Sequence, residues 1–401
     1  MHTNQRAPSL PKLTIVFFDA GGGHRNAANA IRAVIEQQSL PWRVELLNLQ
    51  ELLDEIDPLQ KLAKLRLQDG YNLLLRKGWT RFSAQMLAAL HGMIRVWHAP
   101  VVRRLKSYWS SNSADLVLSV IPNLNRALAE SIRQTLPDAK FVTLLTDFAD
   151  YPPHFWIERE SQFLICGTDR ALEQASALEH DRNHIFRTSG MVLHPKFYQS
   201  QENDRAAGRK RIGLRPDWPT ALVLFGGHGS SVMLKIAQRL CRIPEPLQMI
   251  FICGHNDKLA ATLRALPPTK PMFIEGFTQH VSHYMSLSNF FIGKPGPGSI
   301  AEALHFGLPV IVECNARTLP QERYNAQWVR ENEVGIVLDS FDDIDRAVLK
   351  ILAAGRLDRL KSKVAAHENR AIYEVVDILK KLMNGNTEVP VIAAPEQLAS
   401  M

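Results

Sequence analysis

Residues 290–313 read FFIGKPGPGSIAEALHFGLPVIVE, and this stretch decides the fold. It contains a short apolar run, a turn punctuated by proline and glycine, a helical pattern and a second apolar run. This order predicts a strand, a helix and a second strand of one parallel sheet, so the predicted fold class is α/β. The turn then lies at the carboxyl end of the first strand, where open parallel sheets bind their ligands.

The turn Pro295–Gly298 alternates proline with glycine. Proline fixes the backbone angle φ and glycine frees it, so backbone N–H groups can face a ligand without obstruction by a Cβ atom. The following helix points its positive end at the same place, which suits a phosphate or a diphosphate. A tight turn without a ligand is the alternative, because Ser299-x-x-Glu302 fits a capping box.

The same alternation of apolar runs and helical patterns extends along the rest of the chain. In the second half, further strands are predicted at 221–225, 249–253, 271–274 and 335–338. In the first half, strands are predicted at 12–18, 43–49, 115–120, 140–145, 162–166 and 184–187. Two such series predict two Rossmann-like domains, with ligands bound in a cleft between them.

A polar and charged segment, 199–215, separates the two series and is the expected linker. We therefore expect an N-terminal domain at 1–198 and a C-terminal domain at 216–383, followed by a flexible tail at 384–401. The length of 401 residues agrees with two domains, because single cores stop growing near ~250–300 residues.

The composition is typical of a soluble globular enzyme. Apolar residues make up 46% and charged residues 22% of the chain, which excludes wholesale disorder. The four cysteines show no CxxC spacing and indicate free thiols in a reducing compartment. No apolar run approaches the ~18 residues that span a bilayer, and the run 13–18 is too short for a signal-peptide core. We expect a cytoplasmic protein.

Positive charge is concentrated in residues 60–110, where ten Lys and Arg residues accompany one acidic residue. Aromatic and cationic side chains without a spanning segment are typical of a surface that lies in an anionic bilayer interface. Two alternatives remain open. The charges could be solvated on helices whose apolar face packs in the core, or they could bind nucleic acid, for which no recognisable module is present. The residues expected at such a surface are Trp79, Arg81, Trp97, Arg103 and Arg104.

Two residues at strand ends could take part in acid–base chemistry. His24 follows three glycines after the first strand, where a helix amino terminus lowers the pKa of an imidazole and favours the neutral form that a general base needs. Asp147 closes a later strand and could orient a base or a sugar hydroxyl. His24 could equally line its turn, and Asp147 could cap one.

Three polar residues follow the second strand of the stretch quoted above: Gln321, Glu322 and Asn325. Amides and carboxylates at this spacing can share a polyhydroxylated ligand through paired hydrogen bonds, although surface helices carry the same residue types. No metal-binding set is evident, since the pair Asp343 and Asp345 lies at the start of a late helix, where acids suit the helix dipole.

Six motifs taken together resemble one family. They are GGGHRNAANAI (21–31), TDFADYPPHFW (146–156), SGMVLHPKF (189–197), GGHGSS (226–231), ICGHND (252–257) and KPGPGSIAEALHFGLPVI (294–311). In this order they resemble the diacylglycerol glycosyltransferases, namely the monogalactosyldiacylglycerol synthases and the bacterial diacylglycerol glucosyltransferases. The bacterial peptidoglycan N-acetylglucosaminyltransferase is a more distant relative. The resemblance covers about residues 13–338 and implies the GT-B fold, with two Rossmann-like domains facing across a cleft.

The resemblance also implies an activity: inverting transfer of galactose or glucose from a UDP-sugar to 1,2-diacylglycerol, with no cofactor and no essential metal. His24 and Asp147 would be catalytic, and Glu302 would hold the ribose hydroxyls. His154 and Trp156 would join the basic, Trp-containing region in contacting the acceptor and the membrane. The other donor-binding residues would be Gly226, Gly227, Gly229, Phe277, Pro295, Gly296, Gly298, Ser299, Gln321, Glu322 and Asn325.

The implied partners are a UDP-hexose, diacylglycerol and the anionic inner face of the cell membrane, with no nucleic acid. His228 departs from the family pattern in the loop 226–229, and the choice between glucose and galactose stays open. Two alternatives for the function are transfer to another lipid or polyprenyl-linked acceptor, and a membrane-docked protein that binds nucleotide sugars without turnover.

Overall fold

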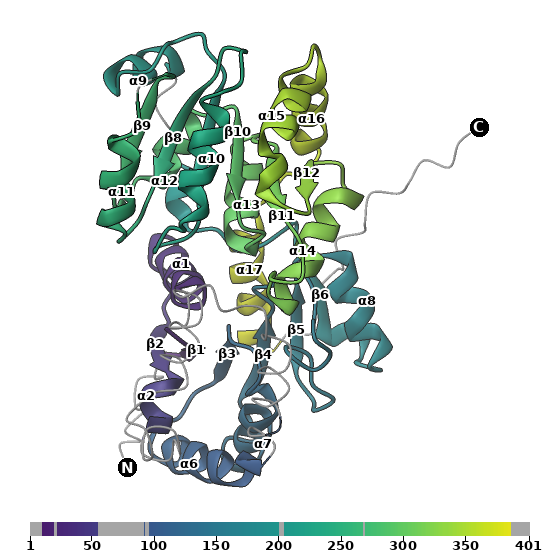
Figure 1. Cartoon of the computed structure of the whole chain (residues 1–401). Helices are drawn as coiled ribbons and strands as arrows, with labels where there is room; N and C mark the ends of the chain where they lie inside the picture. The colour runs from purple at the N-terminus through teal and green to yellow at the C-terminus, as the bar shows by residue number, and fades with distance from the viewer. Residues whose placement is uncertain are drawn as a thin grey trace, which may run out of the picture. The chain divides into compact units, whose positions relative to one another are not determined.

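The chain folds into two compact units, each built in its described residues on a parallel six-stranded sheet (Figure 1). This computed structural model describes residues 10–19, 22–54, 92, 96–199, 204–267 and 269–385. Among these, the first unit comprises residues 10–194 and 370–385, and the second comprises residues 195–369. The prediction of two α/β domains is confirmed.

The strands of the first unit are β1 (Lys12–Phe17), β2 (Arg43–Asn48), β3 (Leu116–Ser119), β4 (Lys140–Leu144), β5 (Phe163–Cys166) and β6 (Ile185–Arg187). They are all parallel in the order β2-β1-β3-β4-β5-β6. The inner strands are apolar and buried, as expected where helices cover both faces of a sheet. The strand order reverses between β1 and β3, and ligands of such sheets bind at this switch point.

Helices of the first unit are α1 (Gly23–Gln37), α2 (Leu49–Leu53), α6 (His98–Ser111), α7 (Asn125–Thr135), α8 (Asp169–Ala177) and α17 (Ala371–Met383), with a 3-10 turn, η3, at Arg182–His184. α6 packs alongside α7 (Figure 1). Both share a core with β1, β3 and β4, in which the buried Trp109 donates its indole N–H to Ser131 Oγ at 3.2 Å. α17 packs against α1, so the last described helix completes the unit in which the chain begins.

The strands of the second unit are β7 (Thr220–Leu224), β8 (Gln248–Ile252), β9 (Met272–Glu275), β10 (Phe290–Gly293), β11 (Val310–Glu313) and β12 (Gly335–Leu338). They are parallel in the order β12-β11-β10-β7-β8-β9. Counted from β7, this is the strand order of the Rossmann fold. Its switch point lies between β7 and β10, so the loops after these two strands are the expected ligand-binding loops.

Helices of the second unit are α9 (Arg205–Arg211), α10 (Val232–Leu240), α11 (Asp257–Arg264), α12 (Val281–Ser286), α13 (Pro297–His305), α14 (Pro320–Glu331), α15 (Ile344–Leu352) and α16 (Arg356–Ala365), with 3-10 turns η4 (Pro195–Phe197) and η5 (Phe341–Asp343). α10, α11, α15 and α16 form one core with β7, β8 and β10. On α10 the buried residues recur at helical spacing, at Met233, Ile236, Ala237 and Leu240.

The strand, helix and strand predicted for residues 290–313 are confirmed as β10, α13 and β11. The capping box considered for Ser299 and Glu302 does not form. Instead α13 begins at Pro297, with Gly296 as its N-cap and no side-chain cap. Proline suits the first helical position because its φ is already helical and its missing N–H needs no partner there. Ser299 therefore lies inside the first turn.

The division into units also locates the expected linker and the last helix. The segment 199–215 contains α9, which lies in the second unit. α17 falls within the expected C-terminal domain 216–383 by sequence, and it lies in the first unit.

Candidate active site

The loops after β7 and β10 meet at the switch point of the second unit. Gly226 has φ of +70°, a left-handed conformation that glycine adopts without strain. A Cβ atom built on Gly226 would lie 4.0 Å from Lys294 Cε, and one built on Gly296 would lie 3.5 Å from the same atom. The side chain of Lys294 therefore lies beside glycines of both loops.

Lys294 follows β10 directly and forms an ion pair with Glu322 on α14. Its Nζ atom lies 2.7 Å from Glu322 Oε1. The Glu322 side chain is 11% exposed, whereas that of Lys294 is 40% exposed. The Glu322 side chain is thus largely covered, whereas that of Lys294 is more exposed to solvent.

Asn325 lies one turn beyond Glu322 on α14 and is fully buried. Its Nδ2 atom donates a hydrogen bond of 2.9 Å to the backbone oxygen of Pro295. Its Oδ1 atom is also buried, and it has no hydrogen-bond partner among the described residues. Gln321 precedes Glu322 and is part-buried. The spacing of Gln321, Glu322 and Asn325 therefore places polar side chains of α14 against the loop after β10.

The amino terminus of α13 faces this loop with backbone donors. The first N–H groups of a helix have no acceptor within the helix. Gly296 is extended and Pro297 carries no N–H, so the first such donors of α13 belong to Gly298 and Ser299. A Cβ atom on Gly298 would meet nothing within 4 Å. The helix end combines open space with a partial positive charge.

Glu302 lies on the second turn of α13 and is part-buried. Burial raises the pKa of its carboxyl from 4.5 to about 7, and the charge of Lys196 partly opposes this rise. Lys196 belongs to η4, and its Nζ donates to the backbone oxygen of Gln279 at 3.4 Å. A carboxylate this poorly solvated gains much from a ligand that donates hydrogen bonds to it.

An aromatic row crosses the carboxyl ends of β7, β8 and β9. The ring of Phe277 stacks on that of His255, with centroids 4.0 Å apart and planes at 15°. The His228 ring lies 5.9 Å from that of His255. The backbones below pack tightly, because a Cβ atom on Gly254 would lie 2.1 Å from the oxygen of Gly227. Phe277 is 57% exposed, so its outer face can receive another flat ring.

In the first unit, His24 lies at the switch point on the first turn of α1. Its Nδ1 atom is 3.3 Å from Thr146 Oγ1, and its ring centroid is 5.9 Å from that of Trp156. Burial lowers the pKa of His24 from 6.5 to about 4, and a hydrogen bond with the backbone of Val120 partly opposes this. The imidazole is therefore neutral at pH 7 and able to accept a proton.

Trp156 links His24 to Asp147. It is fully buried, and its indole N–H donates to Asp147 Oδ2 at 2.9 Å. Asp150 holds the loop in shape, since its carboxylate accepts from the backbone N–H groups of His154 at 2.9 Å and Trp156 at 2.6 Å. Because Trp156 has no exposed surface, it lies beside His24 from within the unit.

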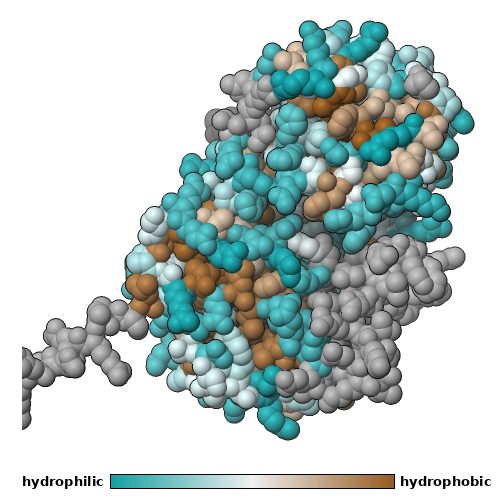
Figure 2. Space-filling model, turned by 90° about the vertical axis from the view of Figure 1, so that its left-hand side faces the viewer, coloured by the Kyte–Doolittle hydropathy of each residue, from teal (hydrophilic) through white to brown (hydrophobic). Residues whose placement is uncertain are grey.

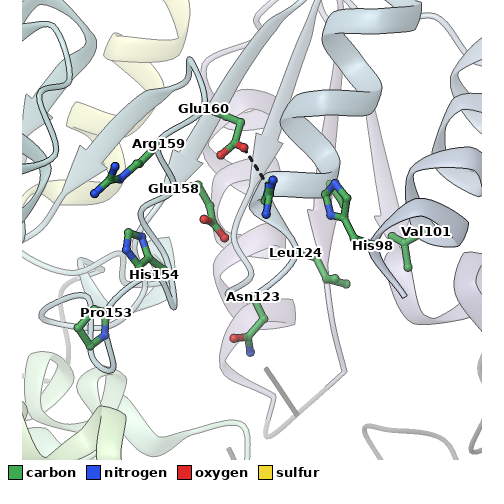
Figure 3. A pocket seen from close by; sticks show the side chains of 11 residues that line it. His98, Val101, Asn123, Leu124, Pro153, His154, Glu158, Arg159 and Glu160 are labelled. Atoms are coloured by element: carbon green, nitrogen blue, oxygen red, sulfur yellow. Dashed lines mark hydrogen bonds and ion pairs between the residues drawn. The ribbon is translucent and has the colours of Figure 1, made fainter. Parts of the chain in front are cut away.

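A hollow of about 370 Å³ lies beside this loop, lined by residues at the starts of α6 and α7 and by Pro153, His154 and residues 158–160 (Figure 3). His154 and Glu158 lie on one side of it, and His98 and Val101 lie on the other. Arg126 and Glu160 form an ion pair of 3.1 Å in its wall. The mixture of apolar and polar side chains suits an amphipathic ligand.

Part of the expected membrane surface can be described. Trp79 and Arg81 lie outside the described residues. Trp97 is part-buried, Arg103 is exposed, and Arg104 donates from Nε to the backbone oxygen of Leu52 at 3.1 Å. On the face drawn in Figure 2, hydrophobic residues form separate patches among hydrophilic ones. Within the described ranges, no helix is both long enough and apolar enough to cross a membrane.

The sequence prediction omitted Lys294 and His255 as site residues. Lys294 had a usable signal, because it is a charged residue placed directly after an apolar strand at the ligand-binding edge. His255 had a weaker one, as it follows a glycine at the end of β8. Among the residues that the structure describes, no three His, Cys, Asp or Glu side chains come together as a metal site.

Two doubly wound units of this kind are the architecture of GT-B glycosyltransferases, and solved structures agree. MurG from Acinetobacter baumannii superposes with a TM-score of 0.63 at 13% identity, covering 92% of this chain and 100% of MurG. The calicheamicin glycosyltransferase CalG4 gives a TM-score of 0.62 at 15% identity, covering 94% of this chain and 99% of CalG4. These likenesses establish the fold.

Sequence comparison shows which class of glycosyltransferase the chain is similar to. The glycosyltransferase family 28 C-terminal domain matches residues 220–382. The chloroplastic monogalactosyldiacylglycerol synthase of Spinacia oleracea is 25% identical over 398 residues, which cover 95% of this chain and 74% of the relative. Monogalactosyldiacylglycerol synthase 1 of Arabidopsis thaliana is 24% identical and is covered to 72%, with 94% of this chain aligned. Residues 220–382 are thus a glycosyltransferase family 28 C-terminal domain, and the chain as a whole is similar to monogalactosyldiacylglycerol synthases in sequence and to MurG in fold.

Proposed function

We propose that this glycosyltransferase transfers galactose or glucose from a UDP-sugar to 1,2-diacylglycerol, with inversion at the anomeric carbon. The observation that carries the proposal is the cradle at the second switch point, where two glycine-containing loops, a helix amino terminus and Lys294 lie together. Such a cradle suits a diphosphate. The relatives supply the acceptor, since they are named as synthases of a galactosylated diacylglycerol.

The donor would lie along the second unit. Its diphosphate would face Gly226 to Gly229 and the N–H groups of Gly298 and Ser299. Its ribose hydroxyls would donate to Glu302, whose raised pKa reflects a carboxylate that lacks such donors. Its uracil would stack on Phe277, and its sugar would be held by Gln321, Glu322 and Asn325.

The first unit would supply the acceptor and the base. The acceptor oxygen attacks the anomeric carbon, the bond from this carbon to the diphosphate oxygen breaks, and the electron pair leaves with UDP. His24 would take the acceptor proton, for which its neutral imidazole is ready. Asp147 would act through Trp156, whose ring lies beside the imidazole.

We further propose that UDP leaves without the help of a metal ion, because N–H groups and a fixed cation can stabilise its developing charge. The hollow in the first unit is proposed to take the polar end of the lipid, with its apolar part directed towards α6. Val96, at the start of this region, is 79% exposed. The protein would then work as a peripheral protein at the anionic inner face of the cell membrane.

The test uses the purified protein with anionic phospholipid vesicles that contain diacylglycerol, and separately UDP-glucose, UDP-galactose and UDP-N-acetylglucosamine. We expect UDP release and a new glycolipid with one of the hexose donors, unchanged by EDTA. His24→Ala should abolish transfer and retain UDP binding. UDP binding without a product from any donor would refute diacylglycerol as acceptor and favour another lipid acceptor or a non-catalytic protein.

A further inference from the structure

Lys294 lies in the cradle of the second unit, where the proposed function needs a fixed cation. We propose that its ammonium group is the cation that neutralises the donor diphosphate, and that Glu322 and Asn325 are positioning residues which hold this cation and its loop. The inference rests on the proposed function, because it assumes that the cradle binds a nucleoside diphosphate.

The location of Lys294 supports a direct contact with an anion. It follows the central strand β10 at the switch point, and its Cε atom lies within 4.0 Å of the Cβ positions of Gly226 and Gly296. The neighbouring glycines Gly227 and Gly298 are open, since a Cβ atom on either would meet nothing within 4 Å, so an anion seated at these loops lies beside the Lys294 side chain. The side chain is 40% exposed, which leaves it accessible to a ligand from solvent.

The partner of Lys294 explains why its charge stays at this place. Glu322 Oε1 lies 2.7 Å from Nζ and the Glu322 side chain is only 11% exposed. A flexible lysine that a buried carboxylate holds in place needs little reorganisation when charge develops on the leaving diphosphate, so the pair favours turnover.

Asn325 fixes the loop in the same way. Its amide donates to the backbone oxygen of Pro295 at 2.9 Å, and the residue is fully buried. The loop that carries Lys294 is thus attached to α14 through two contacts one helical turn apart. Glu322 and Asn325 would therefore have a second role beside holding the sugar, because they also fix the loop that carries Lys294.

The test measures binding of UDP and of uridine by calorimetry to the wild-type chain and to Lys294→Met. Uridine lacks the diphosphate, so it reports whether the remainder of the site is intact. We expect Lys294→Met to weaken UDP binding about 10- to 100-fold, the usual range for loss of a hydrogen bond between charged groups, and to leave uridine binding unchanged. Lys294→Arg keeps the charge and should retain most of the UDP affinity.

A matched control is available in the same unit. Lys363 pairs with Glu333 at the same distance, 2.7 Å, at an exposed site. Lys363→Met should therefore leave both affinities unchanged. If Lys294→Met binds UDP as tightly as the wild type, or loses uridine binding equally, the inference is overturned while the proposed function stands. If the wild-type chain binds no UDP at all, the proposed function itself fails.

The Glu322→Gln variant tests the positioning role, because UDP binding and turnover should respond differently to it. The variant removes a negative charge near the diphosphate, so UDP should bind as tightly as to the wild type or several-fold more tightly. Turnover should nevertheless fall at least 10-fold, because the cation is no longer fixed. The double variant Lys294→Met with Glu322→Gln should bind UDP more tightly than Lys294→Met alone, because it no longer carries the unpaired Glu322 carboxylate near the diphosphate. A Glu322→Gln protein with weakened UDP binding and unchanged turnover would overturn this role.

Discussion

Glu302 on α13 offers a sharp test of the site, because its replacement should affect stability and ligand binding in opposite directions. Burial raises the pKa of its carboxyl from 4.5 to about 7. The folded protein therefore holds this proton more tightly than the unfolded chain does. The resulting stability is fully present below pH 4.5 and is lost as the pH rises through 7. At about 1.4 kcal/mol per pKa unit, the loss above pH 7 amounts to about 3 kcal/mol.

Glu302→Gln keeps the shape of the protonated side chain and cannot ionise. We expect its free energy of unfolding to exceed that of the wild type by up to about 3 kcal/mol at pH 8, and the two proteins to converge near pH 4.5. For a unit of this size, that corresponds to a Tm higher by about 6–12 °C at pH 8. Thermal unfolding at pH 5 and pH 8 measures the difference.

The same substitution should weaken UDP binding, because an amide oxygen accepts from the ribose hydroxyls less strongly than a carboxylate does. Glu331→Gln is the control, since Glu331 is exposed at the end of α14 and bonded to Gln327. It should change neither property. A Glu302→Gln protein whose stability gain is equal at pH 5 and pH 8 would refute the reasoning from burial.

Three further predictions follow from other parts of the site. Because burial lowers the pKa of His24 to about 4, the rate at saturating UDP-sugar, where the ribose hydroxyls keep Glu302 ionised, should persist as the pH falls from 8 to about 5, and an acid limb near 6.5 under these conditions would contradict this. Trp156→Phe removes an indole N–H from the buried Asp147 and should lower the free energy of unfolding by about 1–3 kcal/mol, measured by urea denaturation; no loss would show that the bond contributes nothing. Phe277→Ala should change the free energy of unfolding by no more than about 0.5 kcal/mol, because the ring is exposed. It should nevertheless weaken the binding of both UDP and uridine about 2- to 10-fold, because the ring that stacks on His255 is lost. Calorimetric affinities equal to those of the wild type would exclude a stacking role.

Much of the fold was predictable because it depends on local patterns. Every predicted strand from 12–18 to 335–338 overlaps an observed one, since continuous apolar runs bounded by glycine or polar residues specify buried parallel strands. The start of α13 was less predictable. Ser299 and Glu302 fit a capping pattern, but Pro297 is already suited to the first helical position and starts the helix earlier.

The candidate site was predictable only where it lies at strand ends. The glycine loops and His24 follow strands directly, so topology brings them to a ligand-binding edge. The family resemblance implied that Trp156 contacts the acceptor and the membrane, yet its side chain is buried and its indole N–H donates to Asp147. Sequence patterns give the residue type and its neighbours along the chain, whereas burial depends on packing between distant segments.

The position of α17 has a consequence for how the protein is made. The residues that complete the amino-terminal unit are translated after all of the second unit, and their buried face includes Val375, Val376, Leu379 and Leu382. During synthesis, the partner surface on α1 therefore stays uncovered until the ribosome has passed residue 383. A premature stop codon near residue 370 would leave the second unit's sheet intact and damage the unit encoded at the opposite end of the gene.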